Sequence, residues 1–435
     1  MLRALRLISS LISFAIPGML LSGQQPSSAA TPTTLNTEVA FFGGANGDPA
    51  LPVNGNLLYL GQAIYGSTFA GGGTFGAVTD LGVVFQIPAV TGTDGHQRAT
   101  ILHTFSGPDG SHPNGSLIAD PQGNLYGTTS AGGPANLGTI FKLINPHSAG
   151  TAWSFTLLHA FAGPDGANPS AGLTRGPDGA LYGTAQNGGL MPCDAGGVGH
   201  PQGCGTVFKL TASGTFRILH TFSGQPFTDG AGPASNLVLD PAGNILGTTG
   251  GQTFQSLFGS LYKITPSGTF TVVTSFVRYG PIVPVGNIVR DAAGNVYGMV
   301  GYSGAIPGSP PPVPPGPAIF KVTAITHRTV LLAILPAKPT FGSQGSGVVR
   351  DGAGNLYATT STGGSNGAGA VFALSPSGAL TTLASLGLAN LAPVGGVILD
   401  PTGHLWGTSG AGGNPCETVS NVTPTGCGTV FSLSP

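Results

Sequence analysis

The chain has 435 residues, of which only 7% are charged, and its formal net charge is −1. This balance excludes the basic surface of a nucleic-acid-binding protein and the acidic tail of a charge-driven interaction partner. The 75 glycines and 37 prolines occur together with 40% hydrophobic residues. Because aromatic residues also recur at regular offsets, we expect a folded, turn-rich β protein and not a disordered chain.

Residues 1–30 have the pattern of a secretory signal peptide. Arg3 and Arg6 precede an apolar run, and small residues follow up to Ala30. An uncleaved anchor helix is the alternative, but the run is shorter than the ~20 residues that a membrane span needs. We expect no transmembrane segment after the signal peptide. The protein is therefore predicted to be secreted, periplasmic or at the cell surface, where disulfides persist.

A short phrase recurs along the rest of the chain at intervals of roughly 50 to 60 residues, which is typical of repeat architectures. Its copies are GQAIYGST at 61, DPQGNLYGTT at 120, GPDGALYGTA at 176, DPAGNILGTT at 240, DAAGNVYGMV at 291, DGAGNLYATT at 351 and DPTGHLWGTS at 400. The sequence therefore contains seven repeat units.

Each unit is predicted to form four strands, as the copy at 120 illustrates. Residues 116–119 lead into the turn Asp-Pro-Gln-Gly-Asn, in which proline and glycine favour a tight hairpin. Residues 125–129 form the second strand, residues 138–143 the third and residues 153–161 the fourth. Alternating apolar and polar residues support each strand, and no segment has a helical period.

Seven units of four strands favour a seven-bladed β-propeller of antiparallel blades, forming a single domain over residues 31–435. An open solenoid is the alternative. The last unit ends after its third strand, whereas residues 37–49 resemble the fourth strand of the other units. We therefore expect a strand at about 37–43 to complete the C-terminal blade and close the ring. A solenoid would instead need capping repeats, which the sequence lacks.

The four cysteines occupy equivalent places in units three and seven, in the loop before the third strand. We expect two local disulfides, Cys193 with Cys204 and Cys416 with Cys427. Each would close a loop of about twelve residues and remove roughly 3 kcal/mol of unfolded-state freedom. A four-cysteine zinc site is the alternative, but it would require loops from opposite sides of the ring to meet.

These phrases resemble the GloVer tandem repeat of exported bacterial "choice-of-anchor" proteins. The resemblance covers nearly all of residues 37–435, and LHTFSGPDGSHPNGSLIADPQGNLYGTTSAGGPANLGTIFKL at 102–143 is a strong example. It implies an exported repeat protein, commonly surface-attached, to which no reaction is assigned. The chain ends in a strand at Pro435 without an apolar tail or sorting signal, and this favours a freely secreted or periplasmic form.

The longer loops gather on one face of the predicted propeller, where binding residues are expected. Aspartates that precede glycine in the loops between units could form a ring of ligands for calcium or for sugar hydroxyls, or could simply form turns. Asparagines that open the innermost strands could line the central channel or only hold water. The candidate ligand-binding residues are Asp109, His112, Asn114, Asp165, Asn168, Asp229, Asn236 and Asn287.

No catalytic motif, metal site or cofactor is predicted, apart from calcium. His103, His159 and His220 recur in the fourth strands, but equivalent positions in successive blades cannot converge on one ion, so we expect them to be structural. The leading functional hypothesis is a monomeric, non-enzymatic binding scaffold for carbohydrate or a surface protein. The alternative is an extracytoplasmic polysaccharide lyase or glycoside hydrolase, with its site at the channel mouth on the loop-rich face.

Overall fold

The computed structural model consists of β-sheets that are almost entirely antiparallel, and the described residues contain no helix. It describes residues 34–41, 49–52, 57–72, 80–91, 97–148, 150–189, 193, 203–224, 229–233, 235–250, 259–276, 282–302, 316–336, 345–387, 390–412 and 427–434. The chain divides into Met1–Pro32 and Thr33–Pro435. The predicted signal peptide lies outside the described residues and stays a prediction. Within the described ranges, no helix is long and apolar enough to cross a membrane.

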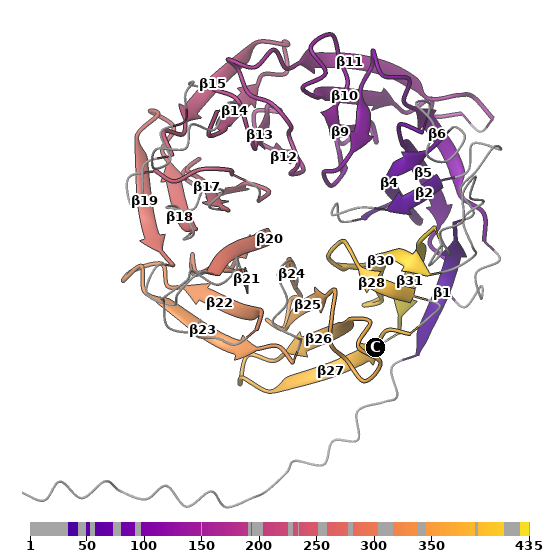
Figure 1. Cartoon of the computed structure of the whole chain (residues 1–435), viewed down its shortest axis with the longest axis vertical. Coiled ribbons are helices and arrows are strands. Elements are labelled where there is room, and N and C mark those ends of the chain that lie inside the picture. Colours follow the sequence, from indigo (N-terminus) through magenta and orange to yellow (C-terminus); the bar gives the residue numbers. More distant parts are fainter. Residues whose placement is uncertain are drawn as a thin grey trace, which may run out of the picture. The chain divides into compact units, whose positions relative to one another are not determined.

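The strands group into four-stranded units, numbered here in chain order (Figure 1). Unit 1 contains β2 (Pro49–Pro52), β3 (Leu58–Leu60), β4 (Ala63–Gly71), β5 (Val83–Pro88) and β6 (Thr100–Thr104). Unit 2 contains β7 (Ser111–Pro113), β8 (Ile118–Ala119), β9 (Leu125–Ala131), β10 (Thr139–Ile144) and β11 (Ser154–Ala160). In both units the first strand is split, because two short segments pair with the same second strand.

The middle of the chain repeats this pattern. Unit 3 contains β12 (Thr174–Arg175), β13 (Leu181–Ala185), β14 (Thr206–Leu210) and β15 (Phe216–Thr221). Unit 4 contains β16 (Val238–Leu239), β17 (Ile245–Thr249), β18 (Ser260–Ile264) and β19 (Phe270–Ser275). Consecutive strands pair antiparallel in each unit, as the four-strand reading of the repeat predicts.

Units 5 and 6 form one eight-stranded sheet, because a parallel bridge between Asn287 and Gly347 joins their first strands. Unit 5 contains β20 (Ile282–Arg290), β21 (Val296–Tyr302), β22 (Ala318–Val322) and β23 (Thr329–Ile334). Unit 6 contains β24 (Gly345–Arg350), β25 (Leu356–Thr360), β26 (Ala370–Leu374) and β27 (Leu380–Ser385).

Unit 7 is assembled from both ends of the chain. It contains β28 (Asn390–Pro393), β29 (Ile398–Leu399), β30 (Leu405–Gly412), β31 (Thr429–Leu433) and β1 (Leu35–Ala40). The N-terminal strand β1 pairs antiparallel with β31, so that the indigo and yellow ends of the chain adjoin in Figure 1. The strand predicted at about 37–43 thus begins two residues earlier and ends at Ala40, and residues 42 and 43 lie outside the described residues.

The third strand of every unit contributes a fully buried aromatic side chain to the core. These side chains are Phe85, Phe141, Phe208, Tyr262, Phe320, Phe372 and Phe431. In unit 2 the ring lies across Gly127, its partner on the neighbouring strand. A Cβ atom at Gly127 would lie 2.6 Å from the ring of Phe141. The ring of Phe141 therefore occupies the space that a side chain at Gly127 would fill, whereas unit 6 has Ala358 at the equivalent position, opposite Phe372.

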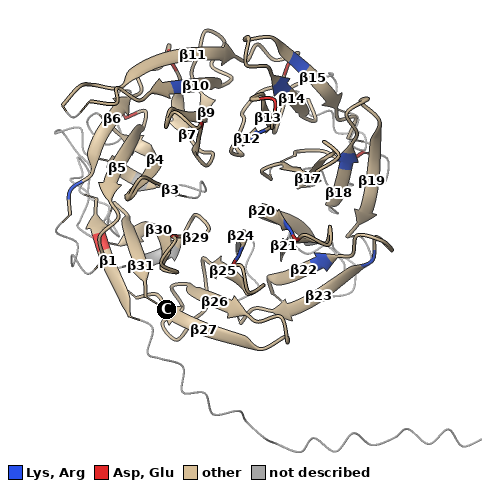
Figure 2. Ribbon diagram, turned by 180° about the vertical axis from the view of Figure 1, so that it is seen from behind, with Lys and Arg blue, Asp and Glu red and all other residues tan. Residues whose placement is uncertain are grey.

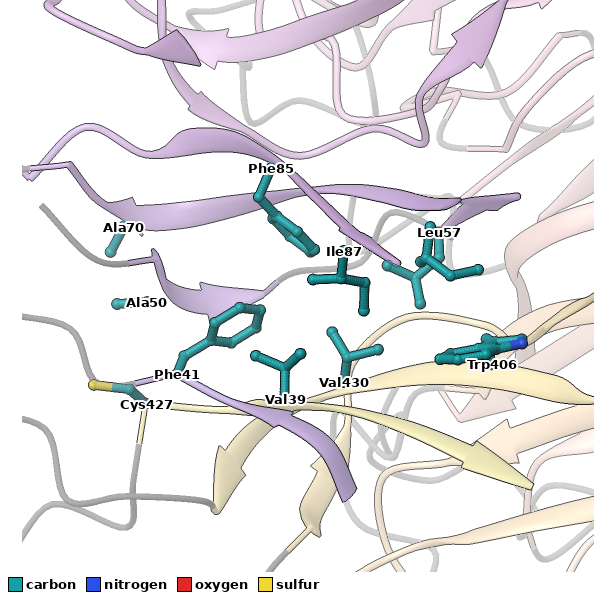
Figure 3. Close-up of a cluster of buried hydrophobic side chains, with 11 residues drawn as sticks. Val39, Phe41, Ala50, Leu57, Ala70, Phe85, Ile87, Trp406, Cys427 and Val430 are labelled. Carbon is teal, nitrogen blue, oxygen red and sulfur yellow. The ribbon is translucent and has the colours of Figure 1, made fainter. Parts of the chain in front are cut away.

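The apolar core consists of clusters that each join two units. Six clusters link consecutive units from 1 to 7. A seventh contains Val39, Phe41 and Val430 of unit 7 together with Phe85 and Ile87 of unit 1, as Figure 3 shows. Each unit therefore buries its apolar faces against two neighbours, and the last unit packs on the first.

A close contact between a glycine of one unit and a proline at the start of the next unit also recurs. A Cβ atom at Gly138 of unit 2 would lie 2.7 Å from Pro169, which precedes unit 3, and one at Gly428 of unit 7 would lie 2.5 Å from Pro52 of unit 1. The junction between the last and first units therefore uses the same close approach of glycine and proline as an internal junction.

Candidate functional site

The aspartates predicted as a ligand ring are held by local hydrogen bonds. Oδ2 of Asp109 lies 2.9 Å from Nε2 of His103, and Oδ2 of Asp165 lies 2.8 Å from Nε2 of His159. The third pair, Asp229 and His220, is 3.4 Å apart. Each aspartate is in a connection between two units, and its histidine is in the fourth strand before that connection. The three carboxylates do not converge, and their ligand-binding role stays a prediction.

Each of these histidines also stacks on a phenylalanine of the next unit. The ring centroids of His103 and Phe155 are 4.3 Å apart, those of His159 and Phe216 are 3.8 Å apart, and those of His220 and Phe270 are 3.9 Å apart. Burial lowers the pKa of His103, although the hydrogen bond and the charge of Asp109 act in the opposite direction. We call each such set of aspartate, histidine and phenylalanine a latch, because it ties a unit to the next one.

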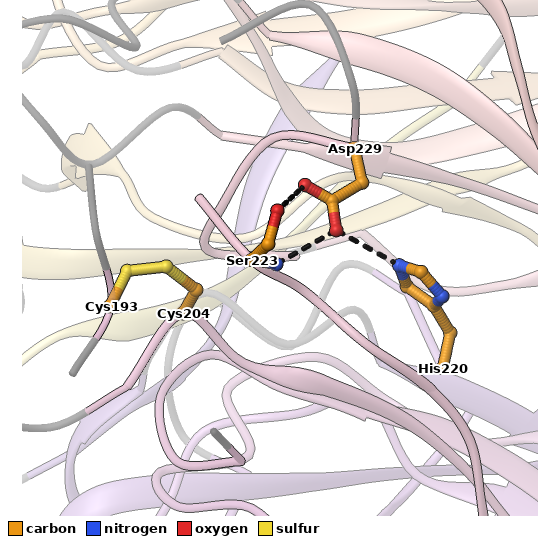
Figure 4. Close-up of a disulfide and its surroundings, with 5 residues drawn as sticks. All are labelled: Cys193, Cys204, His220, Ser223 and Asp229. Atoms are coloured by element: carbon orange, nitrogen blue, oxygen red, sulfur yellow. Dashed lines mark hydrogen bonds and ion pairs between the residues drawn. A yellow bond between two sulfur atoms is a disulfide. The ribbon is translucent and has the colours of Figure 1, made fainter. Parts of the chain in front are cut away.

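The region around the third latch contains a predicted disulfide (Figure 4). Cys193 and Cys204 are bonded, which confirms the first predicted pair. Cys427 is also disulfide-bonded, but its predicted partner Cys416 lies outside the described residues. Burial alone would raise the pKa of Asp229, but the nearby His220 and the hydrogen bonds from Ser223 outweigh burial and lower it below its ordinary value. Among the described residues no three His, Cys, Asp or Glu side chains cluster as metal ligands.

The other predicted residues of this face lie beside the latches. His112 packs on Phe69, with ring centroids 4.2 Å apart, and burial lowers its pKa against the opposing charge of Asp80. The Asn168 side chain donates a hydrogen bond to the carbonyl of Ser130 at 2.8 Å. The Asn114 side-chain oxygen is buried and has no partner among the described residues. The Ser130 hydroxyl also donates a hydrogen bond to the carbonyl of His112 at 2.8 Å, so His112 and Asn168 both contact Ser130. No hydrogen bond joins Asn114 to them among the described residues.

The asparagines that open the inner strands connect neighbouring units. Oδ1 of Asn236 accepts a hydrogen bond from the backbone N–H of Gly172 at 2.6 Å, and so joins unit 4 to unit 3. Asn287 forms the bridge with Gly347 that joins unit 5 to unit 6. Both side chains are partly exposed. Their positions serve the contacts between units, and a role in ligand binding stays a prediction.

The turn of the repeated phrase holds a polar cluster that sequence reasoning missed. Oδ1 of Asp120 accepts the backbone N–H groups of Gln122 and Asn124, and Oδ2 accepts the Asn124 amide and the Tyr126 hydroxyl. Burial, the hydrogen bond and the charge of Asp120 together raise the pKa of Tyr126 to about 12. The tyrosine of the phrase thus closes the turn, and its recurrence six residues after the aspartate was the available signal.

A cleft of about 560 Å³ lies between units 1 and 2. It contains Tyr65 from β4, Gln86 from β5, and Asn145, His147 and Trp153 from the connection between β10 and β11. That connection spans residues 145–153, whereas the equivalent one in unit 3 spans only residues 211–215. The ring centroids of Tyr65 and Trp153 are 6.1 Å apart, in an edge-to-face arrangement. Sequence reasoning missed this cleft, although the longer connection of unit 2 was visible.

Tyr65 differs from the other tyrosines of the repeat. Its hairpin turns at Gly61 and Gln62, both with positive φ, and has no aspartate like Asp120. The Tyr65 hydroxyl consequently has no hydrogen-bond partner in the part of the chain that the structure describes. Burial raises the pKa of Tyr65, so the phenol is neutral near pH 7. The cleft therefore offers an uncommitted proton donor beside an indole ring.

Charged side chains are sparse around the latches and around the cleft between units 1 and 2. Figure 2 shows isolated blue segments on β10, β14, β18 and β22, the strands of Lys142, Lys209, Lys263 and Lys321. The Lys209 ammonium forms an ion pair of 2.8 Å with Asp178. The lining of the cleft between units 1 and 2 includes no aspartate or glutamate among the described residues.

Several solved structures are similar in fold. The extracellular domain of a candidate one-component system from B. thetaiotaomicron has a TM-score of 0.51 at 12% identity, and the match covers 92% of this chain and 40% of that chain. A candidate 6-phosphogluconolactonase from Bacteroides uniformis has a TM-score of 0.49 at 15% identity, with 77% and 85% covered. A gluconolactonase from Xanthomonas campestris has a TM-score of 0.40 at 12% identity, with 72% and 82% covered.

These neighbours correct the leading functional hypothesis. The non-enzymatic scaffold is contradicted, because the solved structures of similar fold include enzymes, among them gluconolactonases and a luciferin-regenerating enzyme. At this level of identity the likeness concerns the fold alone, and their reactions are not transferred to this chain.

The family is given by the sequence of the repeats. No curated protein matches the chain. The family model for the Gloeobacter/Verrucomicrobia repeat matches residues 27–191 and 95–308. The two overlapping matches together span more than half of the chain, and they agree with the resemblance seen in the repeated phrases. The chain belongs to the Gloeobacter/Verrucomicrobia repeat family.

Proposed function

We propose that this protein is an exported polysaccharide lyase built on a closed seven-bladed β-propeller, with its active site in the cleft between units 1 and 2. The observation that carries the proposal is the uncommitted Tyr65 hydroxyl in a cleft lined by Trp153 and His147. The Cys193–Cys204 disulfide supports export, because such bonds persist outside the cytoplasm.

The contacts between units support the closed ring. Clusters of buried apolar side chains link each unit to the next, and the cluster of Phe41 and Phe85 links the last unit to the first. The pairing of β1 with β31 gives unit 7 its fourth strand. In a closed ring only short strand edges remain unpaired, which is how propellers avoid exposed sheet edges.

The cleft provides the groups that eliminative cleavage of a uronate-containing polysaccharide requires. The Trp153 indole offers an apolar face for a sugar ring, and the Gln86 and Asn145 side chains can donate hydrogen bonds to the uronate carboxylate. Such bonds stabilise the charge that develops when the proton next to the carboxylate leaves. The indole and amide side chains of the cleft thus suit the binding of an acidic sugar within a polysaccharide chain.

We assign the proton transfers to His147 and Tyr65. The imidazole of His147 takes the proton from the carbon next to the carboxylate, and the electrons of that C–H bond form a carbon–carbon double bond. The glycosidic C–O bond at the adjacent carbon breaks, and its electron pair stays on the leaving oxygen. The neutral Tyr65 phenol, whose pKa is raised by burial, gives its proton to that oxygen. Proton exchange with solvent then resets both groups.

Glycoside hydrolysis fits this cleft less well. Hydrolases of the common type need two carboxyl groups on either side of the scissile bond, and the described lining supplies neither. The proposed site also lies at the ends of the sheets that carry the Asp120 turn and the connection at residues 145–153. It is thus away from the loop-rich face on which the sequence had placed it.

The test is a survey of uronate-containing polysaccharides with the full-length secreted protein, measured by the ultraviolet absorbance of the unsaturated product. We expect product from at least one substrate, and Tyr65→Phe to lower kcat by about a hundredfold or more. Tyr126→Phe is the matched control, because its hydroxyl is bonded to Asp120, and it should keep full activity. Absence of product from every uronate polymer, or full activity of Tyr65→Phe, would refute the proposal. Turnover of gluconolactones alone would also count against it.

A further inference from the structure

A second cavity, between units 4 and 5, departs from the repeat in a way that indicates a ligand. Its volume is about 180 Å³. Its lining includes Lys263 on β18, Arg290 at the end of β20, and Asp240 in the turn between β16 and β17. Two permanent cations therefore share the cavity with one carboxylate, and the cavity has a net positive charge.

The cavity lies in the unit whose copy of the repeated phrase has no tyrosine at the position of Tyr126. In units 2, 3 and 5 the lysine of the third strand lies over that ring, with Lys142, Lys209 and Lys321 at 5.4, 5.1 and 5.5 Å from the ring centroids of Tyr126, Tyr182 and Tyr297. Unit 4 has Leu246 at this position, and Leu246 also lines the cavity. Lys263 therefore has no ring beneath it, and no ion pair or hydrogen bond holds it among the described residues.

The same substitution leaves an acceptor position of Asp240 unused. Oδ1 of Asp240 accepts the backbone N–H groups of Ala242 and Asn244, whereas Oδ2 accepts only the Asn244 amide, at 2.8 Å. In unit 2 the corresponding oxygen of Asp120 accepts a second hydrogen bond, from the Tyr126 hydroxyl. A hydroxyl group of a ligand in the cavity can take the place of this missing donor.

Arg290 is placed by the turn that follows it. A Cβ atom at Gly294 would lie 2.9 Å from Nη2 of Arg290, so the guanidinium lies over the turn glycine. Arg350 has the same relation to Gly354, also at 2.9 Å, in unit 6. Arg290 forms no ion pair among the described residues, and its charge contributes to holding the pKa of Asp240 below its ordinary value. Its donors remain available for a planar anion.

We propose that this cavity binds a small hydroxycarboxylate, a single sugar acid, with the carboxylate between Arg290 and Lys263 and a hydroxyl donated to Asp240. A guanidinium and an ammonium group both form charge-assisted hydrogen bonds with a carboxylate. At about 30 Å³ for each water in the liquid, the cavity has room for about six waters, which suits one sugar ring and not a polymer. The site catalyses no reaction and is independent of the cleft between units 1 and 2.

The experiment is calorimetric titration of the full-length protein with glucuronate. Glucose and inorganic sulfate serve as the uncharged and the hydroxyl-free comparison ligands. We expect glucuronate to bind and both comparison ligands to bind at least about tenfold more weakly. Equal binding of glucose would refute the role of the two cations, equal binding of sulfate would refute the role of Asp240, and absence of glucuronate binding would refute the whole proposal.

Three variants locate the binding in this cavity. Arg290→Gln should weaken glucuronate binding by about tenfold or more, since it removes charge-assisted hydrogen bonds to the carboxylate. Arg350→Gln, the same change at the matching position of unit 6, should leave it unchanged. Leu246→Tyr restores the repeat, removes no charge and should abolish binding because the ring fills the cavity and bonds Asp240. Equal effects of the two arginine variants, or full binding by Leu246→Tyr, would overturn the assignment. If the Leu246→Tyr protein has a lower melting temperature than the parent, the comparison of Arg290→Gln with Arg350→Gln decides whether the ligand binds in this cavity.

Discussion

Phe41 provides the sharpest test of the junction between the last and first units. Its side chain is 2% exposed and packs edge-to-face on Phe85 of unit 1, with ring centroids 5.3 Å apart. Phe161 makes the equivalent contact between units 2 and 3, where it is 1% exposed and lies 5.4 Å from Phe208. The backbone N–H groups of Phe41 and Phe161 also donate equivalent 3.0 Å hydrogen bonds, to Gly428 and Gly138. The two residues are therefore a matched pair.

Truncation of a buried phenylalanine costs about 3–5 kcal/mol. If β1 is an integral strand of unit 7, Phe41→Ala and Phe161→Ala should each lower the free energy of unfolding by about 4 kcal/mol. The assay is urea denaturation followed by tryptophan fluorescence, since Trp406 lies in the same cluster as Phe41. A double-mutant cycle of Phe41 with Phe85 should show a coupling of about 0.5–1.5 kcal/mol. A Phe41→Ala protein as stable as the parent would refute the docking of the N-terminal strand.

Two further predictions concern stability. Replacing Cys193 and Cys204 by alanine should lower the free energy of unfolding by about 3 kcal/mol, because the bond closes a loop with a sequence separation of 11; an unchanged urea midpoint would show that the bond does not constrain the unfolded chain. Because burial holds the pKa of folded His103 below its unfolded value of 6.5, its contribution is complete above pH 6.5 and is lost as the pH falls through the folded pKa. The melting temperature should therefore fall on acidification from neutral pH, and His103→Gln should flatten this dependence; an equally steep profile in that variant would contradict the assignment.

The repeated phrase was sufficient to predict the strands and the fourth strand at the N-terminus. Hairpin signals are local, and the turn at Asp120 places the flanking strands without help from the rest of the chain. The Cys193–Cys204 pair was predictable for the same reason, since both residues lie in one short loop. The repeated sequence therefore predicts the structure within a unit.

Features between units were not predictable in the same way. Asp109 suggests a ligand when it is read alone, but its partner is His103, whose other neighbour Phe155 comes from the next unit. The cleft joins Tyr65 to Trp153 across almost ninety residues of sequence. The loss of tyrosine at Leu246 is visible in the repeat alignment, but its consequence depends on Arg290 of the following unit. Such contacts join residues of different units, so the pattern within one unit does not reveal which side chains meet.

The latches occupy only part of the molecule. They join units 1 to 4, whereas Ala333 and Ala384 stand at the histidine position of units 5 and 6 in the same strand pairing. Cooperative opening should therefore begin in the second half of the chain, and amide hydrogen exchange should be faster in β22 to β27 than in β10 to β15. Although the units are nearly equal in sequence, they would then unfold in a defined order that depends on three histidines.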